Sequence, residues 1–427
     1  MPPQPANPPP APDFDSMLSR KFGPEVANYF SGSPLNRVAF LRHEHGFLSQ
    51  AVRHPSTRFL LCNDLQPLTR GDTPGRLAYV EHGAVQGVIG TDPYSVLEKE
   101  MLAQYDSGAY VPQMVFLGID ERAQAGERLE FQGKNLYKGA PYFAVDVTPR
   151  LSVKEACESL VKKLGEEGFS FAKGRVMDVE AKDAAIYAES RQLLDWNARN
   201  PFCAQCGQPT LSVNGGFKRT CPPSDLARLS SPSAALPTTG AAPTNPSDRP
   251  PCATRLGVSN LSFPRTDPTV IMAVVNHAGD RLLLGRQRRW PPFWYSTLAG
   301  FAEPAESIEE AVRREVYEES GVLVGRVVIH STQPWPYPAN LMIGAIGQAV
   351  PGDGEVIDLG NDPELDDAKW FSFEEVREAL RVGTSGLGEE AGAEYREGGL
   401  RLPPSTAIAH QLMVSVCNGF VSGVPKM

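Results

Sequence analysis

Three closely spaced glutamates, Glu315, Glu318 and Glu319, stand in a segment that predicts a helix over 308–320. At about 100° per residue, Glu315 and Glu319 lie on the apolar face of this helix, with Glu318 at its edge. Carboxylates that point inward at this spacing would repel one another and lose hydration, unless a cation lies among them. A divalent metal is the simplest such cation, and oxygen ligands favour Mg2+ or Mn2+. An ordinary amphipathic helix with a charged rim is the alternative.

The helix has start and stop signals. Ser307 followed by Glu310 fits a capping box, and Gly321 is a natural C-terminal stop. Residues 300–322 read GFAEPAESIEEAVRREVYEESGV and fit the pattern G-x5-E-x7-R-E-U-x-E-E-x-G-U, with U an aliphatic residue, at every fixed position. This pattern is the Nudix box. The chain therefore resembles a Nudix hydrolase, which implies metal-dependent cleavage of a diphosphate.

Four cysteines predict a second metal site. Cys203 and Cys206 form a C-x2-C knuckle, Cys221 follows, and Cys252 comes after the proline- and serine-rich segment 222–251. Four thiolates around a tetrahedral Zn2+ would make a structural ribbon that is closed to water. A redox-active C-x2-C is the alternative, but this knuckle does not begin a helix in a thioredoxin-like unit.

A proline-stiffened aromatic loop narrows the resemblance. Residues 332–342 read TQPWPYPANLM and resemble the S-Q-P-W-P-F-P-x-S motif of the NADH pyrophosphatase branch of the Nudix family. Thr332 and Tyr337 replace Ser and Phe of that motif, and Asn340 replaces its last Ser. A rigid loop with tryptophan and tyrosine offers a stacking wall for a planar base. For the motif alone, a packing loop is the alternative.

The elements that must position these residues follow from the hydrophobic pattern. In the first half of the chain, the runs RFLLC, LAYVEH, MVFLGID and YFAVDV predict strands, and 153–168 and 183–200 predict helices. In the second half, 269–276 and 281–287 predict a hairpin. Strand LAGF then leads into the box helix, and further strands and two helices follow.

The order of modules also resembles the NADH pyrophosphatase branch. We expect a multidomain α+β protein in which the Nudix domain is an α/β/α sandwich with a mixed sheet. Its expected parts are a disordered proline-rich tail (1–28), an amino-terminal NADH-pyrophosphatase-like domain (29–198), a zinc ribbon (199–262) with a disordered insertion (222–251), and the Nudix domain (263–427). In this family the third and fourth ribbon cysteines are much closer together in the sequence.

The resemblance implies roles for residues that match the family's motifs. Glu315, Glu318, Glu319 and Glu364 would be catalytic and would hold Mg2+ or Mn2+, with the carbonyl of Ala299 as a further ligand. Glu318, or else Glu364, would accept the proton of the attacking water.

The resemblance also implies a dinucleotide pocket. Phe301 would stack on a substrate ring, and Arg314 would orient the box glutamates. The other expected pocket residues are Gln333, Pro334, Trp335, Pro336, Tyr337, Pro338, Ala339, Asn340 and Ala409.

Charge guides the choice of substrate. A net charge of −9 and a pI of about 5.4 argue against a protein whose main function is to bind nucleic acid. The resemblance implies that NADH is hydrolysed to reduced nicotinamide mononucleotide and AMP, with NAD+ and related dinucleotides as further substrates. Because of the acidic charge, we expect the free dinucleotide before an RNA-linked one. NAD-capped RNA and a non-catalytic nucleotide-sensing module are the alternatives.

Compartment and assembly are less well marked. Seven unevenly spaced cysteines suit a reducing compartment, and no apolar run is long enough to span a membrane. The chain ends in Pro-Lys-Met, a distant relative of the Ser-Lys-Leu peroxisomal signal, so we expect a cytoplasmic or peroxisomal protein. The resemblance implies a homodimer.

Overall fold

The computed structural model divides into two units. It describes residues 5–9, 25–229, 248–255, 261–303, 306–360 and 364–418. The sandwich unit comprises Met1–Gly32, Glu180–Ala185 and Thr266–Met427, and the ribbon unit comprises Ser33–Val179 and Ile186–Arg265. In the described part of the chain, no helix has both the length and the apolar character that a membrane span requires.

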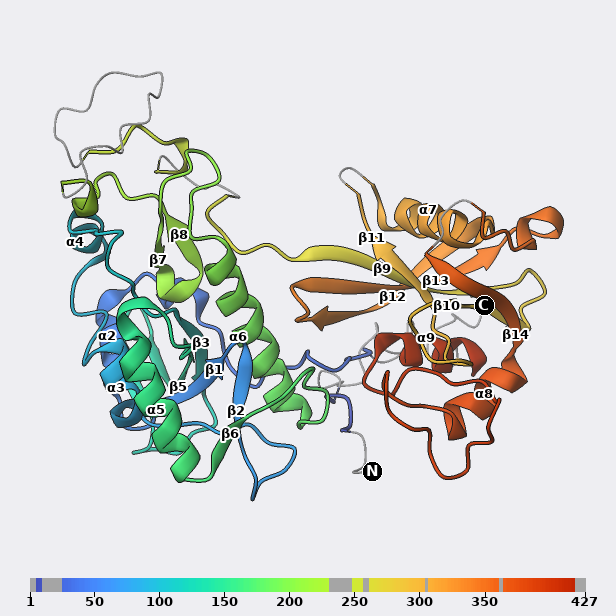
Figure 1. Ribbon diagram of the computed structural model, residues 1–427, viewed down its shortest axis with the longest axis horizontal. Helices are drawn as coiled ribbons and strands as arrows, with labels where there is room; N and C mark the ends of the chain where they lie inside the picture. The colour runs from blue at the N-terminus through green and yellow to red at the C-terminus, as the bar shows by residue number, and fades with distance from the viewer. Residues whose placement is uncertain are drawn as a thin grey trace. The chain divides into compact units, whose positions relative to one another are not determined.

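The sandwich unit is built on a mixed sheet with strand order β12-β13-β9-β10-β14, and β11 pairs with β9 (Figure 1). Strands β13 and β9 are parallel, and the other pairs are antiparallel. The strands are β9 (Asp267–Val275), β10 (Arg281–Gln287), β11 (Leu298–Phe301), β12 (Val324–Trp335), β13 (Asn340–Ala349) and β14 (Leu365–Ser372). The helices are α7 (Ile308–Ser320), α8 (Phe373–Val382) and α9 (Ile408–Cys417).

Helices cover both faces of this sheet. Because successive side chains of a strand point to opposite faces, alternate residues of β9 belong to two different cores. They are Val270, Met272 and Val274 in the core with α7, and Ile271, Ala273 and Val275 in the core with α8 and α9. Figure 1 shows α7 on one side of the sheet and α8 and α9 on the other. The predicted α/β/α sandwich with a mixed sheet is confirmed.

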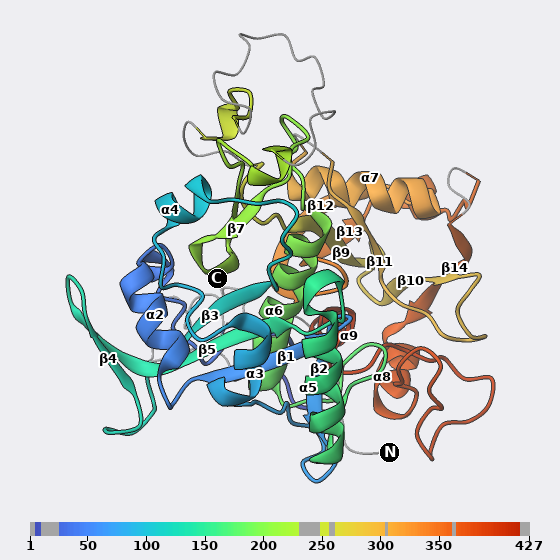
Figure 2. The ribbon, with the colours of Figure 1, turned by 60° about the vertical axis from the view of Figure 1, so that its left-hand side comes forward.

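The ribbon unit has its own sheet, with strand order β3-β5-β1-β2-β6 and β4 paired to β5. Its strands are β1 (Arg58–Asn63), β2 (Gln66–Arg70), β3 (Met114–Asp120), β4 (Leu129–Gln132), β5 (Leu136–Asp146) and β6 (Phe169–Phe171). Its helices are α2 (His45–Arg53), α3 (His82–Ile89), α4 (Glu98–Ala103), α5 (Lys154–Glu166) and most of α6 (Ala181–Arg199). Helices α3 and α5 lie side by side (Figure 2), and with α2 they pack their apolar residues into one core with the sheet.

One predicted strand is wrong. Residues 77–82, LAYVEH, make isolated bridges instead of a strand, and His82 already begins α3. Val80 exchanges two backbone hydrogen bonds with Phe59, of 2.9 and 3.0 Å, and the pairing does not extend into a ladder. The other three runs form β1, β3 and β5, as predicted.

Helix α6 carries a buried acidic residue. Glu189 is only 7% exposed, and one of its carboxylate oxygens lies 3.1 Å from a guanidinium nitrogen of Arg37. Burial raises the pKa of Glu189 to about 7, although the positive charges of Arg37 and Arg42 act to lower it. Burial also lowers the pKa of Arg42, to about 10. The carboxyl group of Glu189 is therefore the member of this cluster whose pKa lies near neutral pH.

Candidate active site and metal sites

The box helix α7 begins and ends where the sequence predicts. The side chain of Ser307 accepts a hydrogen bond from the Glu310 amide (3.2 Å), and the Glu310 carboxylate accepts one from the Ser307 amide (2.7 Å). The helix stops at Gly321, whose φ of 73° lies in the left-handed region that glycine tolerates. Its amide donates to the Tyr317 carbonyl (2.8 Å). Both predicted caps are confirmed.

Arg314 is the centre of the box. Its guanidinium donates two hydrogen bonds to Glu306, of 2.6 and 2.9 Å, one to Glu315 of 2.8 Å and one to Glu318 of 3.0 Å. A further bond of 2.9 Å reaches the carbonyl of Phe301 at the end of β11. These charge-assisted bonds hold the pKa of Glu306 down to about 2. Arg314 thus fixes the positions of Glu306, Glu315 and Glu318.

The carboxyl group of Glu315 lies directly against the backbone of Gly300. A methyl group at Gly300 would lie 2.0 Å from the carboxyl carbon of Glu315, so any other residue at this position would force the carboxyl group to move. Burial raises the pKa of Glu315, Arg314 opposes this rise, and the charges of Glu318 and Glu364 add to it. Glu364, which lies in the β13–β14 connection, is therefore close enough for its charge to raise the pKa of Glu315.

The remaining expected metal ligands differ in exposure. Glu319 is 3% exposed, whereas Glu364 is exposed and accepts a hydrogen bond of 2.7 Å from the Gln287 amide. Ala299 is half-buried in β11, next to Gly300. Hard oxygen donors of this kind suit Mg2+ or Mn2+. Of the expected metal ligands, Glu315 and Glu318 are hydrogen-bonded to Arg314. In the described part of the chain, the group whose possible ligand atoms converge is the four cysteines of the ribbon.

The aromatic loop joins the end of β12 to the start of β13. The rings of Trp335 and Tyr337 are both half-buried, and their centroids lie 5.5 Å apart with planes at 72°. The peptide bond before Pro338 is cis. Asn340 is buried, and its amide donates to the hydroxyl of Thr269 (3.1 Å). The loop therefore carries two half-buried aromatic rings in edge-to-face contact with each other.

The other expected pocket residues are placed differently from one another. Phe301 is 57% exposed, so its ring is available for stacking. Ala409 is buried in α9, within the core that α8 and α9 share with the sheet. Gln333 is 1% exposed, and its amide is hydrogen-bonded to other parts of the protein. Of the others, Pro336 and Ala339 are buried, Pro334 is half-buried and Pro338 is exposed.

The four cysteines of the ribbon meet at one point. The sulfurs of Cys203 and Cys252 are 3.7 Å apart, those of Cys206 and Cys221 are 3.5 Å apart, and all four lie within 4.8 Å of one another. Tetrahedral Zn2+ with Zn–S bonds of about 2.3 Å requires S–S separations of about 3.8 Å. Cys252 thus joins the cluster despite its distance in the sequence.

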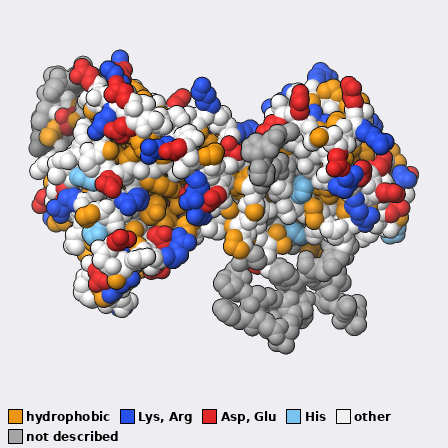
Figure 3. Space-filling view, turned by 90° about the horizontal axis from the view of Figure 1, so that it is seen from below, with side chains coloured by type: hydrophobic (Ala, Val, Ile, Leu, Met, Phe, Trp, Pro, Cys, Tyr) orange, Lys and Arg blue, Asp and Glu red, His pale blue; other side chains and the backbone are white. Residues whose placement is uncertain are grey.

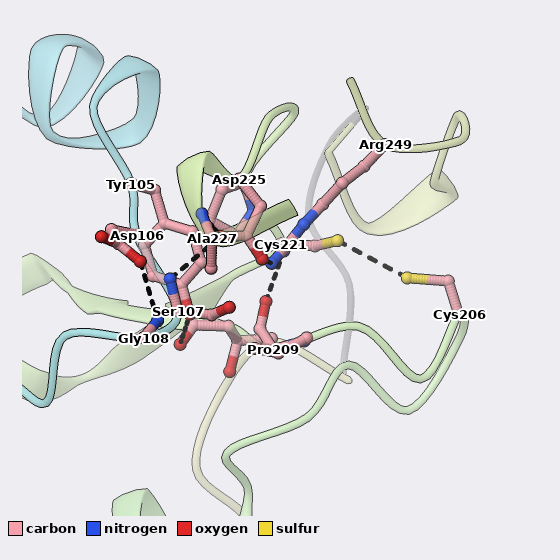
Figure 4. Close-up of polar contacts among 12 residues, drawn as sticks. Tyr105, Asp106, Ser107, Gly108, Cys206, Pro209, Cys221, Asp225, Ala227 and Arg249 are labelled. Carbon is pink, nitrogen blue, oxygen red and sulfur yellow. Dashed lines mark hydrogen bonds and ion pairs between the residues drawn. The ribbon is translucent and has the colours of Figure 1, made fainter. Parts of the chain in front are cut away.

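A buried ion pair supports this ribbon (Figure 4). Asp225 and Arg249 form an ion pair with both side chains almost completely buried. Arg249 also donates to the carbonyl of Pro209 (2.6 Å), beside the knuckle, and Asp225 accepts a bond from the Ser107 amide (2.9 Å). The two ends of the long insertion are thus joined to each other and to the ribbon unit.

Two segments predicted to be disordered are ordered in part. The prediction for 222–251 is wrong at both ends, where Asp225 and Arg249 are buried. The prediction for 1–28 is wrong at Asn28, which is 1% exposed. The charged residues of this proline-rich insertion lie only near its two ends, at Asp225, Arg228, Asp248 and Arg249, and this is the signal that could have shown its ordered ends. Within these two predicted segments, residues 1–4, 10–24 and 230–247 lie outside the described part of the chain.

Comparisons with known proteins identify the family. Family models match three parts of the chain: a NUDIX domain at 265–387, an NADH pyrophosphatase zinc ribbon domain at 198–227, and an NADH pyrophosphatase-like rudimentary NUDIX domain at 56–196. The match of the last model shows that the amino-terminal domain is itself related to Nudix domains, which the sequence patterns did not reveal.

Relatives match nearly the whole chain. It is 32% identical over 394 residues to the NAD-capped RNA hydrolase of Schizosaccharomyces pombe, an alignment that covers 91% of this chain and 92% of the relative. It is 34% identical over 401 residues to NAD-capped RNA hydrolase NUDT12 of Homo sapiens, covering 91% and 73% respectively. NAD(P)H pyrophosphatase NUDT13, mitochondrial, of Mus musculus is 33% identical over 277 residues, covering 64% and 66%. This chain belongs to the Nudix hydrolases, in the group that carries the NADH pyrophosphatase zinc ribbon.

Proposed function

We propose that this enzyme hydrolyses the diphosphate bond of NADH, and of NAD+ and related dinucleotides, to a nicotinamide mononucleotide and AMP. The observation that carries this proposal is the intact box, in which Arg314 holds Glu315 and Glu318 in place and the charge of Glu364 acts on Glu315. The half-buried aromatic loop belongs to the same unit and supplies surfaces suited to a planar base. Relatives named as NAD(P)H pyrophosphatases support the dinucleotide.

Glu315, Glu318, Glu319 and Glu364 would hold Mg2+ or Mn2+, together with the carbonyl of Ala299. When bound, the metal neutralises charge on the diphosphate and makes a water molecule more acidic. Glu318 is the first candidate for the residue that accepts the proton of the attacking water, because its side chain is 46% exposed. Glu364 is the second candidate.

The base of the substrate would stack on exposed aromatic surface. Phe301 offers an exposed ring next to the box, and Trp335 and Tyr337 offer half-buried rings in the loop. The buried amide of Gln333 is better suited to supporting the loop than to contacting the substrate, since its polar atoms already have protein partners. This differs from the role that the resemblance implies.

The ribbon would hold one structural Zn2+. Four cysteine sulfurs fill all four positions of a tetrahedral site and leave none for water, so this metal would stabilise the fold and take no part in the reaction.

NAD-capped RNA is the second candidate substrate. It is favoured by the names of the relatives from Schizosaccharomyces pombe and Homo sapiens, which align with most of this chain. The net charge of −9 counts against a long RNA interface. On the face drawn in Figure 3, Lys and Arg side chains are interspersed with Asp and Glu side chains on each unit. We therefore place the free dinucleotide first.

One competition assay ranks these substrates. The enzyme is incubated with Mn2+ or Mg2+ and equal concentrations of NADH, NAD+, ADP-ribose and a short NAD-capped RNA, and the products are separated by chromatography. We expect the highest kcat/KM for NADH. A higher value for the capped RNA would reverse the order of the two proposals, and no product from any of them would overturn both.

Three further proposals need their own measurements. The homodimer can be tested by analytical ultracentrifugation. The domain boundaries at 28/29, 198/199 and 262/263 can be tested by limited proteolysis. The Pro-Lys-Met terminus lies outside the described residues, and imaging of a tagged protein with and without these three residues tests peroxisomal targeting.

A further inference from the structure

Residues 28–30, called the strap here, pack inside the sandwich unit although they stand far from it in the sequence. Asn28, Tyr29 and Phe30 are 1%, 0% and 2% exposed, respectively. All three lie before the first residue that any of the matched family domains covers. The burial of the strap is therefore a property of this chain that the domain matches do not account for.

The strap is hydrogen-bonded to the end of β12, just before the aromatic loop. The amide of Asn28 donates to the hydroxyl of Ser331 (3.0 Å) and to the carbonyl of Thr332 (2.9 Å). The carbonyl of Tyr29 accepts a bond of 3.0 Å from the amide of Gln333. The strap thus follows the strand that leads into the loop.

Gln333 connects the strap to a third element. The same amide nitrogen also donates to the carbonyl of Thr406 (2.8 Å), and its oxygen accepts from the backbone amide of Ile408 at the start of α9 (2.9 Å). Because Gln333 is buried, these polar groups have no water to replace a lost partner. One side chain therefore fixes the loop against both the strap and α9.

The ring of Phe30 supports the two rings of the loop. Its centroid lies 6.0 Å from that of Trp335, with planes at 80°, and 6.2 Å from that of Tyr337, with planes at 73°. Both are edge-to-face contacts. Phe30 has a φ of 72°, in the left-handed region that large side chains rarely adopt. The backbone holds this unfavourable conformation while the ring is buried under the loop.

We propose that the strap orders the aromatic loop and thereby sets the affinity of the enzyme for its dinucleotide. Phe30 is a positioning residue: it is buried behind Trp335 and Tyr337, whose half-exposed rings would meet the base. This inference rests on the proposed function, because the role of the loop as a base-stacking wall belongs to that proposal. It adds to the binding site a segment that lies outside the matched Nudix domain.

The variant Phe30→Gly tests the strap without straining the backbone. Glycine adopts a positive φ at little cost, so the change removes the ring and leaves the chain path favourable. We expect the KM for NADH to rise about tenfold, from the loss of two aromatic contacts, with kcat unchanged. Phe30→Leu keeps apolar bulk and should restore part of the affinity. Phe40→Ala removes a phenylalanine that is 55% exposed in the ribbon unit and should leave KM unchanged.

Hydrogen exchange gives a readout that does not depend on activity. In Phe30→Gly we expect faster amide exchange across 333–340, with exchange in α7 unchanged. Unchanged exchange in the loop, or a lower kcat at unchanged KM, would overturn the inference while leaving the proposed function intact. If the parent enzyme cleaved no dinucleotide, the proposed function would fail, and the exchange data alone would then decide whether the strap orders the loop.

Discussion

Replacing Gly300 by alanine should disable the enzyme without unfolding it. The added methyl group would lie 2.0 Å from the carboxyl carbon of Glu315, and real contacts of this kind are essentially never below 3.0 Å. The carboxyl group must therefore move by about 1 Å or more, away from its hydrogen bond with Arg314. Misplacement of a reacting group by about 1 Å can lower the rate about a hundredfold. We expect a loss of that order in kcat/KM.

The stability of the fold should change much less than the activity. The methyl group meets the end of a flexible side chain, so the backbone of β11 can stay in place, and overpacking of this kind costs about 1–3 kcal/mol. Urea unfolding measures this loss in the free energy of unfolding, and initial rates with NADH and Mn2+ measure kcat/KM.

Gly325→Ala is the matched control. Gly325 also lies in the sandwich unit, and a methyl group there would meet its nearest neighbours at 3.7 Å, which is ordinary contact. We expect this variant to retain full activity. If Gly300→Ala and Gly325→Ala had the same kcat/KM, the position of Glu315 would not matter to the reaction and this reasoning would be refuted.

Two further predictions concern the ribbon unit. Cys252→Ala should lower both the zinc content and the thermal midpoint, because three thiolates no longer close the site, whereas the control Cys62→Ala should keep the zinc. Elemental analysis measures the zinc content, and thermal unfolding measures the midpoint. Retained zinc in Cys252→Ala would contradict the account. The pKa of Glu189 is about 7 in the folded state, against an unperturbed value of 4.5. Between these two pH values the folded state therefore keeps a proton that the unfolded state loses. The stability that this proton contributes is fully present below pH 4.5 and is lost as the pH rises through about 7. Glu189→Gln should remove up to about 3 kcal/mol of this pH dependence, measured by urea unfolding from pH 4 to pH 8, and curves of equal slope would contradict it.

The local features of the active site could be predicted from the sequence because they depend on neighbouring residues. The caps at Ser307 and Gly321 and the helix between them follow from short-range hydrogen bonding and from the period of the apolar residues. The strand predicted at 269–276 follows in the same way from a local apolar run, and it forms most of β9. Each of these predictions is confirmed.

The features that depend on distant contacts could not be predicted in this way. The run LAYVEH has the composition of a strand, but pairing with Phe59 stops after one bridge. Gln333 has the sequence context of a pocket residue, and its burial depends on Tyr29, 304 residues away in the chain. Asp225 and Arg249 lie in a stretch of disordered composition and are held by pairing with each other. In each case a partner far along the chain decides the structure.

The variant Glu318→Gln tests the central claim most directly. The change keeps the size of the side chain and removes its capacity to accept a proton. With NADH and Mn2+, we predict that release of AMP and reduced nicotinamide mononucleotide falls at least about a hundredfold, as expected for the loss of a general base, while the thermal midpoint stays that of the parent enzyme. Unchanged turnover in this variant would contradict the claim that the box glutamates carry out the hydrolysis.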